Sequence, residues 1–187
     1  MNVLQGILTF VIDTIAGLFA GFLLLRFWMQ VQRVRPPMAL AQAIFQITDW
    51  MIQPLRRIVP SFRGYDWASL VGAFLVALLA MTLDYLLVNR LPVSTIVILA
   101  VFRLVQWIFY GLMAILILEA IFSWVNPHAP LAPFIRALND PILNPLRRIL
   151  PSLGGIDFSP LVAVIILQVL IRLANELLMQ VLASSFY

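Results

Sequence analysis

The sequence contains no cysteine, no lysine and one histidine, and only 11% of its 187 residues are charged. Without cysteine, a disulfide framework, a thiolate metal site and an iron–sulfur cluster are all excluded. With His128 as the only histidine, most histidine-based metal and catalytic sites are excluded too. The remaining polar residues form no catalytic set, so the sequence predicts neither an enzyme nor a cofactor.

Hydrophobic residues, in contrast, make up 63% of the chain. An average soluble domain carries about 25% charged residues, so lipid is the expected solvent for this chain. All 12 basic residues are arginine, whose planar guanidinium suits phosphate groups, including lipid headgroups. The net charge of +4 is not gathered in a long basic run, so nucleic acid is not an expected partner.

Four long apolar segments lie at about residues 3–31, 67–88, 94–124 and 161–183. Roughly 20 apolar residues cross a bilayer as a helix. The first segment has no positive region before it, so we expect a retained span and not a cleaved signal peptide. The fold class predicted is therefore an all-α integral membrane protein with four transmembrane helices.

Two connections between these spans show helical periodicity of another kind. Apolar residues recur three or four apart at Leu40, Ile44, Ile47, Met51, Leu55 and Ile58, and again at Leu138, Ile142, Leu146 and Ile149. Polar residues recur between them, which predicts one amphipathic helix at the membrane surface in each connection. Pro54 should bend or restart the first of these helices.

The distribution of the arginines indicates which connections face the cytoplasm. The 32–66 and 125–158 connections together hold eight arginines, whereas the 89–93 connection holds only Arg90. Cytoplasmic loops are enriched in basic residues. We therefore expect both amphipathic helices in the cytoplasm, and both termini on the opposite, periplasmic side of a bacterial inner membrane.

The same two connections carry an internal repeat. PLRRIVPSFRGYDWASL, residues 54–70, and PLRRILPSLGGIDFSPL, residues 145–161, are identical at ten of 17 positions. Each copy lies between two spans, so both units should insert in the same orientation. The sequence thus predicts two parallel repeats, residues 1–90 and 91–187, about a pseudo-twofold axis along the membrane normal.

The motifs SWVNPHAP, DPILNPLRRILP and GGIDFSP of the second repeat resemble those of the YggT family of small bacterial inner-membrane proteins with two YGGT repeats. Arg26 matches the family's arginine before Ser-Trp, but its counterpart in the second repeat is Glu119. The first repeat lacks Ser-Trp, and has Arg63-Gly64 for Gly-Gly and Ser69 for the final proline. The resemblance implies links to osmotic or potassium homeostasis, cell division, and, in plastid relatives, nucleoid distribution and cytochrome assembly.

The arginine doublets Arg56/Arg57 and Arg147/Arg148 have two compatible interpretations. They hold the connections inside, or each doublet binds anionic lipid phosphates, at about 1 kcal/mol per basic residue near an anionic surface. The prolines around each doublet favour a fixed backbone shape, which topology alone does not require.

Asp66 and Asp157 precede the second and fourth spans. We expect each aspartate to cap the following helix by accepting a backbone N–H hydrogen bond. A second interpretation is that each also pairs with the arginine doublet of its own repeat, which would fix the surface helix against the span.

Charges inside spans are costly and mark candidate sites. Arg26 and Glu119 occupy matching positions near the cytoplasmic ends of the first and third spans. One hypothesis is an ion pair between them across the repeats, and the alternative is that each side chain reaches the interface separately. Arg172 and Glu176 lie four apart in the fourth span and can pair there, as a structural pair or along a polar path.

Two functions fit these features. The first is a non-enzymatic membrane scaffold or organiser, whose basic surface helices bind anionic phospholipid or a cytoplasmic partner. The alternative is a small channel or transport component in ion (potassium) homeostasis. The partners expected are the lipid bilayer and anionic phospholipid, with self-association and an unidentified membrane or cytoplasmic protein as further candidates.

Overall fold

The computed structural model describes residues 3–62, 64–88, 95–150 and 157–185, which form six helices and no strand. The helices are α1 (Val3–Val31), α2 (Met38–Ile58), α3 (Trp67–Val88), α4 (Ile96–Val125), α5 (Ala132–Arg147) and α6 (Ser159–Ser185). Arg63, Arg90, the Pro151–Ser152 end of the second PLRR stretch and the residues Gly154, Gly155 and Ile156 lie outside the described residues.

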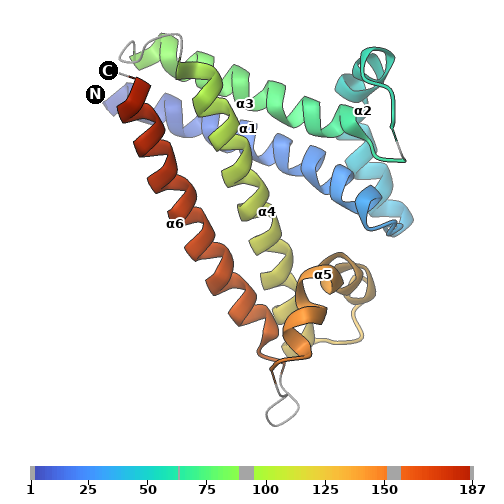
Figure 1. Ribbon diagram of the computed structural model, residues 1–187. Coiled ribbons are helices and arrows are strands. Elements are labelled where there is room, and N and C mark those ends of the chain that lie inside the picture. The colour runs from blue at the N-terminus through green and yellow to red at the C-terminus, as the bar shows by residue number, and fades with distance from the viewer. Residues whose placement is uncertain (1–2, 63, 89–94, 151–156, 186–187) are drawn as a thin grey trace.

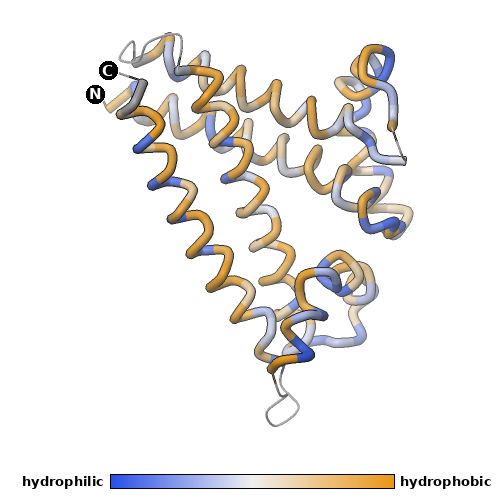
Figure 2. The backbone as a smooth tube through the Cα atoms, viewed as in Figure 1, coloured by the Kyte–Doolittle hydropathy of each residue, from blue (hydrophilic) through white to orange (hydrophobic). Residues whose placement is uncertain are grey.

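Four of these helices are long and apolar enough to cross a membrane: Val3–Val31, Trp67–Leu87, Ile96–Val125 and Ser159–Ala183. They coincide with the four segments expected from the sequence. The prediction of an all-helical chain with four helices long and apolar enough to span a membrane is therefore confirmed. Figure 2 shows hydrophobic residues along nearly the full length of all four.

The long helices are arranged as two antiparallel pairs, α1 with α3 and α4 with α6, joined where α3 and α1 contact α4. In Figure 1 the two pairs diverge from one end of the molecule, where both chain termini lie. The shorter helices α2 and α5 lie away from this end, each beyond the long helices of its own half. Each half therefore has the same order, a long helix, a short helix and a second long helix.

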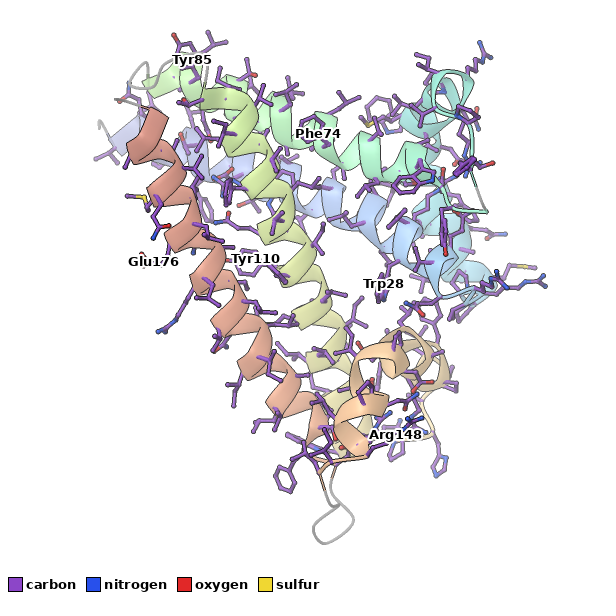
Figure 3. The ribbon with its side chains drawn as sticks, viewed as in Figure 1. Trp28, Phe74, Tyr85, Tyr110, Arg148 and Glu176 are labelled. Carbon is purple, nitrogen blue, oxygen red and sulfur yellow. The ribbon has the colours of Figure 1, made fainter. Side chains whose placement is uncertain are left out.

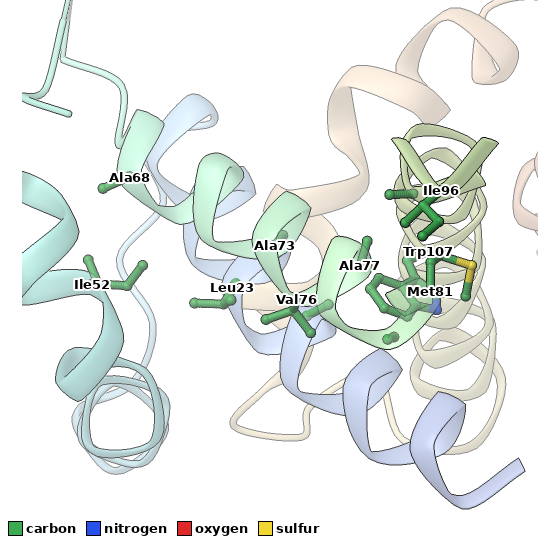
Figure 4. Packing of buried hydrophobic residues seen from close by; sticks show 12 residues of the cluster. Leu23, Ile52, Ala68, Ala73, Val76, Ala77, Met81, Ile96 and Trp107 are labelled. Atoms are coloured by element: carbon green, nitrogen blue, oxygen red, sulfur yellow. The ribbon is translucent and has the colours of Figure 1, made fainter. Parts of the chain in front are cut away.

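Small residues allow the long helices to approach closely. Ala20 of α1 and Ala73 and Ala77 of α3 are completely buried in the main apolar cluster, where Trp107 of α4 also packs (Figure 4). A Cβ atom on Gly17 would lie 3.1 Å from the Trp107 ring nitrogen. Interfaces of small residues are typical of helices packed in membranes, because dispersion contacts replace the hydrophobic driving force there.

The helix α2 is held against the spans by one face. Ile44, Thr48 and Ile52 are buried on that face, and a Cβ atom on Gly72 of α3 would lie 3.3 Å from Ile52. The helix continues through Pro54 to Ile58, so it does not restart there. A proline inside a helix removes one backbone hydrogen bond and crowds the carbonyl four residues before it, and α2 accommodates Pro54 despite both effects.

The helix α5 joins both halves. Leu143 packs with Leu116 of α4 and Leu167 of α6, and Leu138 packs in a second cluster with Ile44 of α2. The ring nitrogen of Trp28, near the end of α1, donates a hydrogen bond of 3.0 Å to the Leu138 carbonyl. The apolar cluster beside the end of α1 therefore includes residues of both short helices.

Candidate functional site: two ion clusters

The first group of charges, which we call the N-terminal ion cluster, consists of Arg26, Asp49, Arg56 and Asp66. The Asp66 carboxylate lies at its centre and is only 2% exposed. It accepts hydrogen bonds from both Arg56 Nε (3.2 Å) and Arg56 Nη2 (2.7 Å), and from Arg26 Nε (3.3 Å). Arg26 Nη1 pairs with Asp49 at 2.5 Å. The four charges alternate in sign and join α2 to α1 and to the residue that precedes α3.

The second group, the C-terminal ion cluster, consists of Glu119, Asp140, Arg147 and Asp157. Each of the three nitrogens of the Arg147 guanidinium faces a different carboxylate. Nη2 lies 2.6 Å from Glu119, Nε 2.7 Å from Asp157 and Nη1 3.4 Å from Asp140. This cluster joins α4, α5 and the start of α6.

The two clusters have the same arrangement of charged groups, except that one position carries the opposite charge. In the N-terminal cluster a carboxylate is surrounded by two guanidinium groups, and in the C-terminal cluster a guanidinium is surrounded by three carboxylates. The difference comes from Arg26 in α1 and Glu119 in α4. As a result, the C-terminal cluster has an excess of acceptors, and Glu119 Oε2 is buried without a hydrogen-bond partner among the described residues.

The hypothesis of an ion pair between Arg26 and Glu119 is wrong. Each side chain binds charges of its own half, Arg26 through Asp49 and Asp66 and Glu119 through Arg147. The reason is that each short helix folds back onto the end of its own preceding span, and so offers a nearer opposite charge.

The second interpretation of Asp66 and Asp157, a pair with the arginine doublet of the same half, agrees with the geometry. Both pairs span ten residues, Arg56 with Asp66 and Arg147 with Asp157. Asp157 also accepts the Ser159 backbone N–H at 2.9 Å, as expected of a helix cap. The Asp66 side chain instead accepts the Ser69 hydroxyl at 2.8 Å.

The two arginines of each doublet have different surroundings. The first members, Arg56 and Arg147, bind the aspartates. The second members, Arg57 and Arg148, are exposed and in no ion pair among the described residues; Figure 3 shows Arg148 at the outside of α5. Within the part of the chain that the structure describes, each doublet therefore has one arginine in an ion cluster and one outside any ion pair.

Arg172 and Glu176 do not form the expected pair within α6. Both side chains are exposed, and neither is in an ion pair among the described residues. Glu176 points away from α4 in Figure 3, and Gln168 and Gln180 lie one turn beyond on the same row. Figure 2 shows several hydrophilic bands along α6, which is otherwise largely hydrophobic.

Asp49 of α2 and Asp140 of α5 belong to these clusters but were not singled out from the sequence. One signal in the sequence is spacing, because each lies seven residues before the first arginine of its doublet, Arg56 or Arg147. Seven residues are two helical turns, which places both side chains on one face. Asp140 pairs with Arg147, whereas Asp49 pairs with Arg26.

A further pair lies within the spans. Arg103 of α4 lies 3.3 Å from Asp13 of α1, and Asp13 Oδ1, Thr9 Oγ1 and Asp84 Oδ1 are buried without hydrogen-bond partners among the described residues. In lipid, such polar groups are expensive and usually face one another or a water-filled space. This polar group is therefore a second candidate site.

Burial alone would raise the pKa of Asp66 and of Asp157. The hydrogen bonds from Arg56 and Ser69 outweigh that effect at Asp66, and those from Arg147 and Ser159 do so at Asp157, so both pKa values lie below the ordinary 3.8. The same contacts raise the pKa of Arg56 and Arg147. Each pair is therefore charged throughout the physiological range.

These lowered pKa values predict acid-sensitive stability. A carboxyl with a lowered folded pKa stabilises the fold fully above its ordinary pKa of 3.8, and this stabilisation is lost as the pH falls through the folded pKa. We expect Asp66→Asn/Asp157→Asn to be less stable than the wild type at neutral pH, with the two curves converging in acid. Thermal unfolding in detergent, followed by circular dichroism across this range, measures the effect. Parallel curves would contradict the assignment.

Comparison with known proteins shows similarity over most of the chain. The family model described as CCB3/YggT matches residues 5–87 and again 98–178. The chain belongs to the CCB3/YggT family. Among its CCB3/YggT relatives, the uncharacterised protein YggT of Escherichia coli K12 is 35% identical over 164 residues, which are 87% of this chain and 86% of the relative.

Two other bacterial relatives extend this comparison. An uncharacterised protein of Pseudomonas aeruginosa is 36% identical over 172 residues, 86% of this chain and 84% of its own length. One from Haemophilus influenzae is 32% identical over 168 residues, 89% of this chain and 91% of its own. No solved structure was found to match. The resemblance to the YggT family seen in the sequence is therefore confirmed.

Proposed function

We propose that the protein is a non-enzymatic organiser of the bacterial inner membrane, whose two short helices lie on the cytoplasmic surface and bind anionic phospholipid. In this arrangement the termini are periplasmic, as the eight arginines of the two connections favour. The two halves then insert in parallel, and both short helices lie on one membrane face.

One observation carries this proposal. Arg57 and Ile58 at the end of α2 are exposed, and so are Arg148 and Ile149 at the end of α5. Ile58 is 80% and Ile149 79% exposed. A basic residue beside an exposed aliphatic residue suits the membrane interface, because the aliphatic side chain enters the acyl boundary while the arginine meets the phosphates.

The first member of each doublet supports this role indirectly. Arg56 and Arg147 fix the short helices to Asp66 and Asp157. The following residue, Arg57 or Arg148, is therefore presented on a rigid element. A fixed guanidinium loses less conformational entropy on binding a phosphate than one on a mobile loop.

The test is retention of anionic lipid by the full-length protein. We expect Arg57→Gln/Arg148→Gln to weaken the association of phosphatidylglycerol with the protein by roughly thirtyfold, because each basic residue near an anionic surface contributes about 1 kcal/mol. Spin-labelled lipid in mixed vesicles measures the association constant.

Two control variants separate the effect of the charge from the effect of its position in the fold. Arg57→Lys/Arg148→Lys should keep most of the association, and Arg172→Gln, which removes an exposed arginine of α6, should keep all of it. Equal association for the glutamine variant and the wild type would refute lipid binding at the doublets.

A second candidate function is transport of an ion, and the polar group of Asp13, Asp84 and Arg103 within the spans favours it. Its buried oxygens, which have no hydrogen-bond partners among the described residues, are groups that a passing cation could meet. Potassium flux into vesicles that contain the pure protein, abolished by Asp84→Asn, would favour transport over the surface role. Unchanged lipid association in that variant would separate the two functions.

A further inference from the structure

A cavity of about 660 Å³ lies beside the end of α1, between this helix, the α1–α2 connection and α2. Its polar wall includes Gln30, Arg33, Arg35, Gln53 and Arg56. Neither Arg57 nor Arg148 lines it, so the cavity is distinct from the surface proposed above to bind lipid.

The cavity is strongly basic. Four of its lining residues are arginines, including Arg26, and among the described residues their only ion pairs are with Asp49, in the wall, and with Asp66. Arg33 and Arg35 are in no ion pair among the described residues. Two guanidinium groups are therefore left with unused donors, and guanidinium binds phosphate through two parallel hydrogen bonds.

The backbone at Arg33 is an independent observation. Its φ of 56° is the positive value that normally selects glycine. It ends α1 in a Schellman motif, with the Val34 N–H bound to the Met29 carbonyl at 2.9 Å and the Arg33 N–H to the Gln30 carbonyl at 3.1 Å. Attraction between a cation and the helix C-terminus offsets part of the strain. The conformation holds an arginine at the cavity where glycine would be less strained.

The remaining walls indicate what kind of anion fits. Met29, Val34, Pro36 and the ring of Phe45 make part of the lining apolar, and the Arg26 guanidinium stacks over that ring at 4.8 Å. The volume lies within the range of small-molecule sites, about 300–1,000 Å³, and far exceeds that of a lone phosphate ion. The corresponding α4–α5 connection, NPHAPL at 126–131, contains no arginine.

We infer that this cavity is a binding site for an organic phosphate, in which Arg33 and Arg35 hold the phosphate group and the Phe45 side holds the carbon skeleton. The phosphate comes either from a lipid headgroup or from a soluble molecule. The site belongs to the N-terminal half alone, so the two halves differ in binding although they share one fold.

The test uses the full-length protein in zwitterionic nanodiscs with two probes. One is soluble glycerol 3-phosphate, followed by calorimetric titration, and the other is phosphatidic acid within the disc, counted by native mass spectrometry. We expect Arg33→Gly and Arg35→Gln each to weaken binding about tenfold. Arg33→Gly should leave the melting temperature unchanged or higher, because glycine accepts the positive φ without strain.

A response to glycerol 3-phosphate identifies a soluble ligand, and saturable phosphatidic acid alone identifies a lipid headgroup; either supports the site. Arg136→Gln, which removes an exposed arginine outside the cavity, should bind as the wild type does. The inference is overturned if neither probe binds, if Arg35→Gln binds normally, or if Arg136→Gln loses binding equally. Loss of lipid association in the Arg57/Arg148 variant has no bearing on these outcomes.

Discussion

Exchange of Arg147 for methionine is expected to lower the free energy of unfolding by about 3–5 kcal/mol, and exchange of Arg148 by less than about 0.5 kcal/mol. The two residues are neighbours, but only the first is in the C-terminal ion cluster. The Glu119 side chain is 4% exposed in the wild type, and without Arg147 it loses its only ion pair among the described residues. Heat unfolding in detergent, followed by circular dichroism, compares the two variants.

A double variant tests whether the loss arises from the buried charge. Glu119→Gln removes that charge, so Arg147→Met/Glu119→Gln should recover part of the stability that Arg147→Met loses. Glu119→Gln alone should have a small effect, because the cluster has more carboxylates than guanidinium groups. Equal losses at Arg147 and Arg148, or no recovery in the double variant, would contradict the cluster.

The exchange Leu143→Ala should cost about 2–5 kcal/mol, the usual range for a buried leucine. Leu143 is completely buried between α4, α5 and α6, where it packs with Leu116 and Leu167. The side chain is the main apolar anchor of α5 on its own half. Loss of this anchor should release α5, which denaturant unfolding and limited proteolysis of the 126–131 connection both detect.

Ile149→Ala is the matched comparison, since Ile149 follows α5 and is largely exposed. Its removal should leave stability within about 0.5 kcal/mol of the wild type. If the surface proposal holds, it should instead weaken insertion of this segment into the interface. A stability loss as large as that of Leu143→Ala would mean that Ile149 is buried in the folded protein.

The four spans were predictable because their signal is long and redundant. Each contains about 20 or more apolar residues, so no single position decides the outcome. The pairing of Arg56 with Asp66 and of Arg147 with Asp157 was also accessible as an alternative, because the same ten-residue spacing occurs twice. Repetition within one chain supplies the comparison that a single sequence otherwise lacks.

Partner choice was harder to predict, because it depends on how the short helices fold back. Arg26 and Glu119 have opposite charge at matching positions, which suggested a pair across the halves. The sequence does not contain the direction in which α2 and α5 return, and this direction brings a nearer partner to each. Arg172 and Glu176 have suitable spacing too, but i,i+4 pairs contribute only about 0.2–0.5 kcal/mol, too little to fix their rotamers.

The division of the charges between two separate clusters has a consequence for synthesis at the ribosome. Arg26 and Asp66 are 40 residues apart, so the N-terminal cluster is complete once α3 has begun to emerge, before α4 exists. Chains generally fold by units from the N-terminus. Helix α2 can then be secured early, while the hydrogen bond from Trp28 to Leu138, 110 residues away, must wait for α5. The first half thus serves as a preassembled template on which the second half docks.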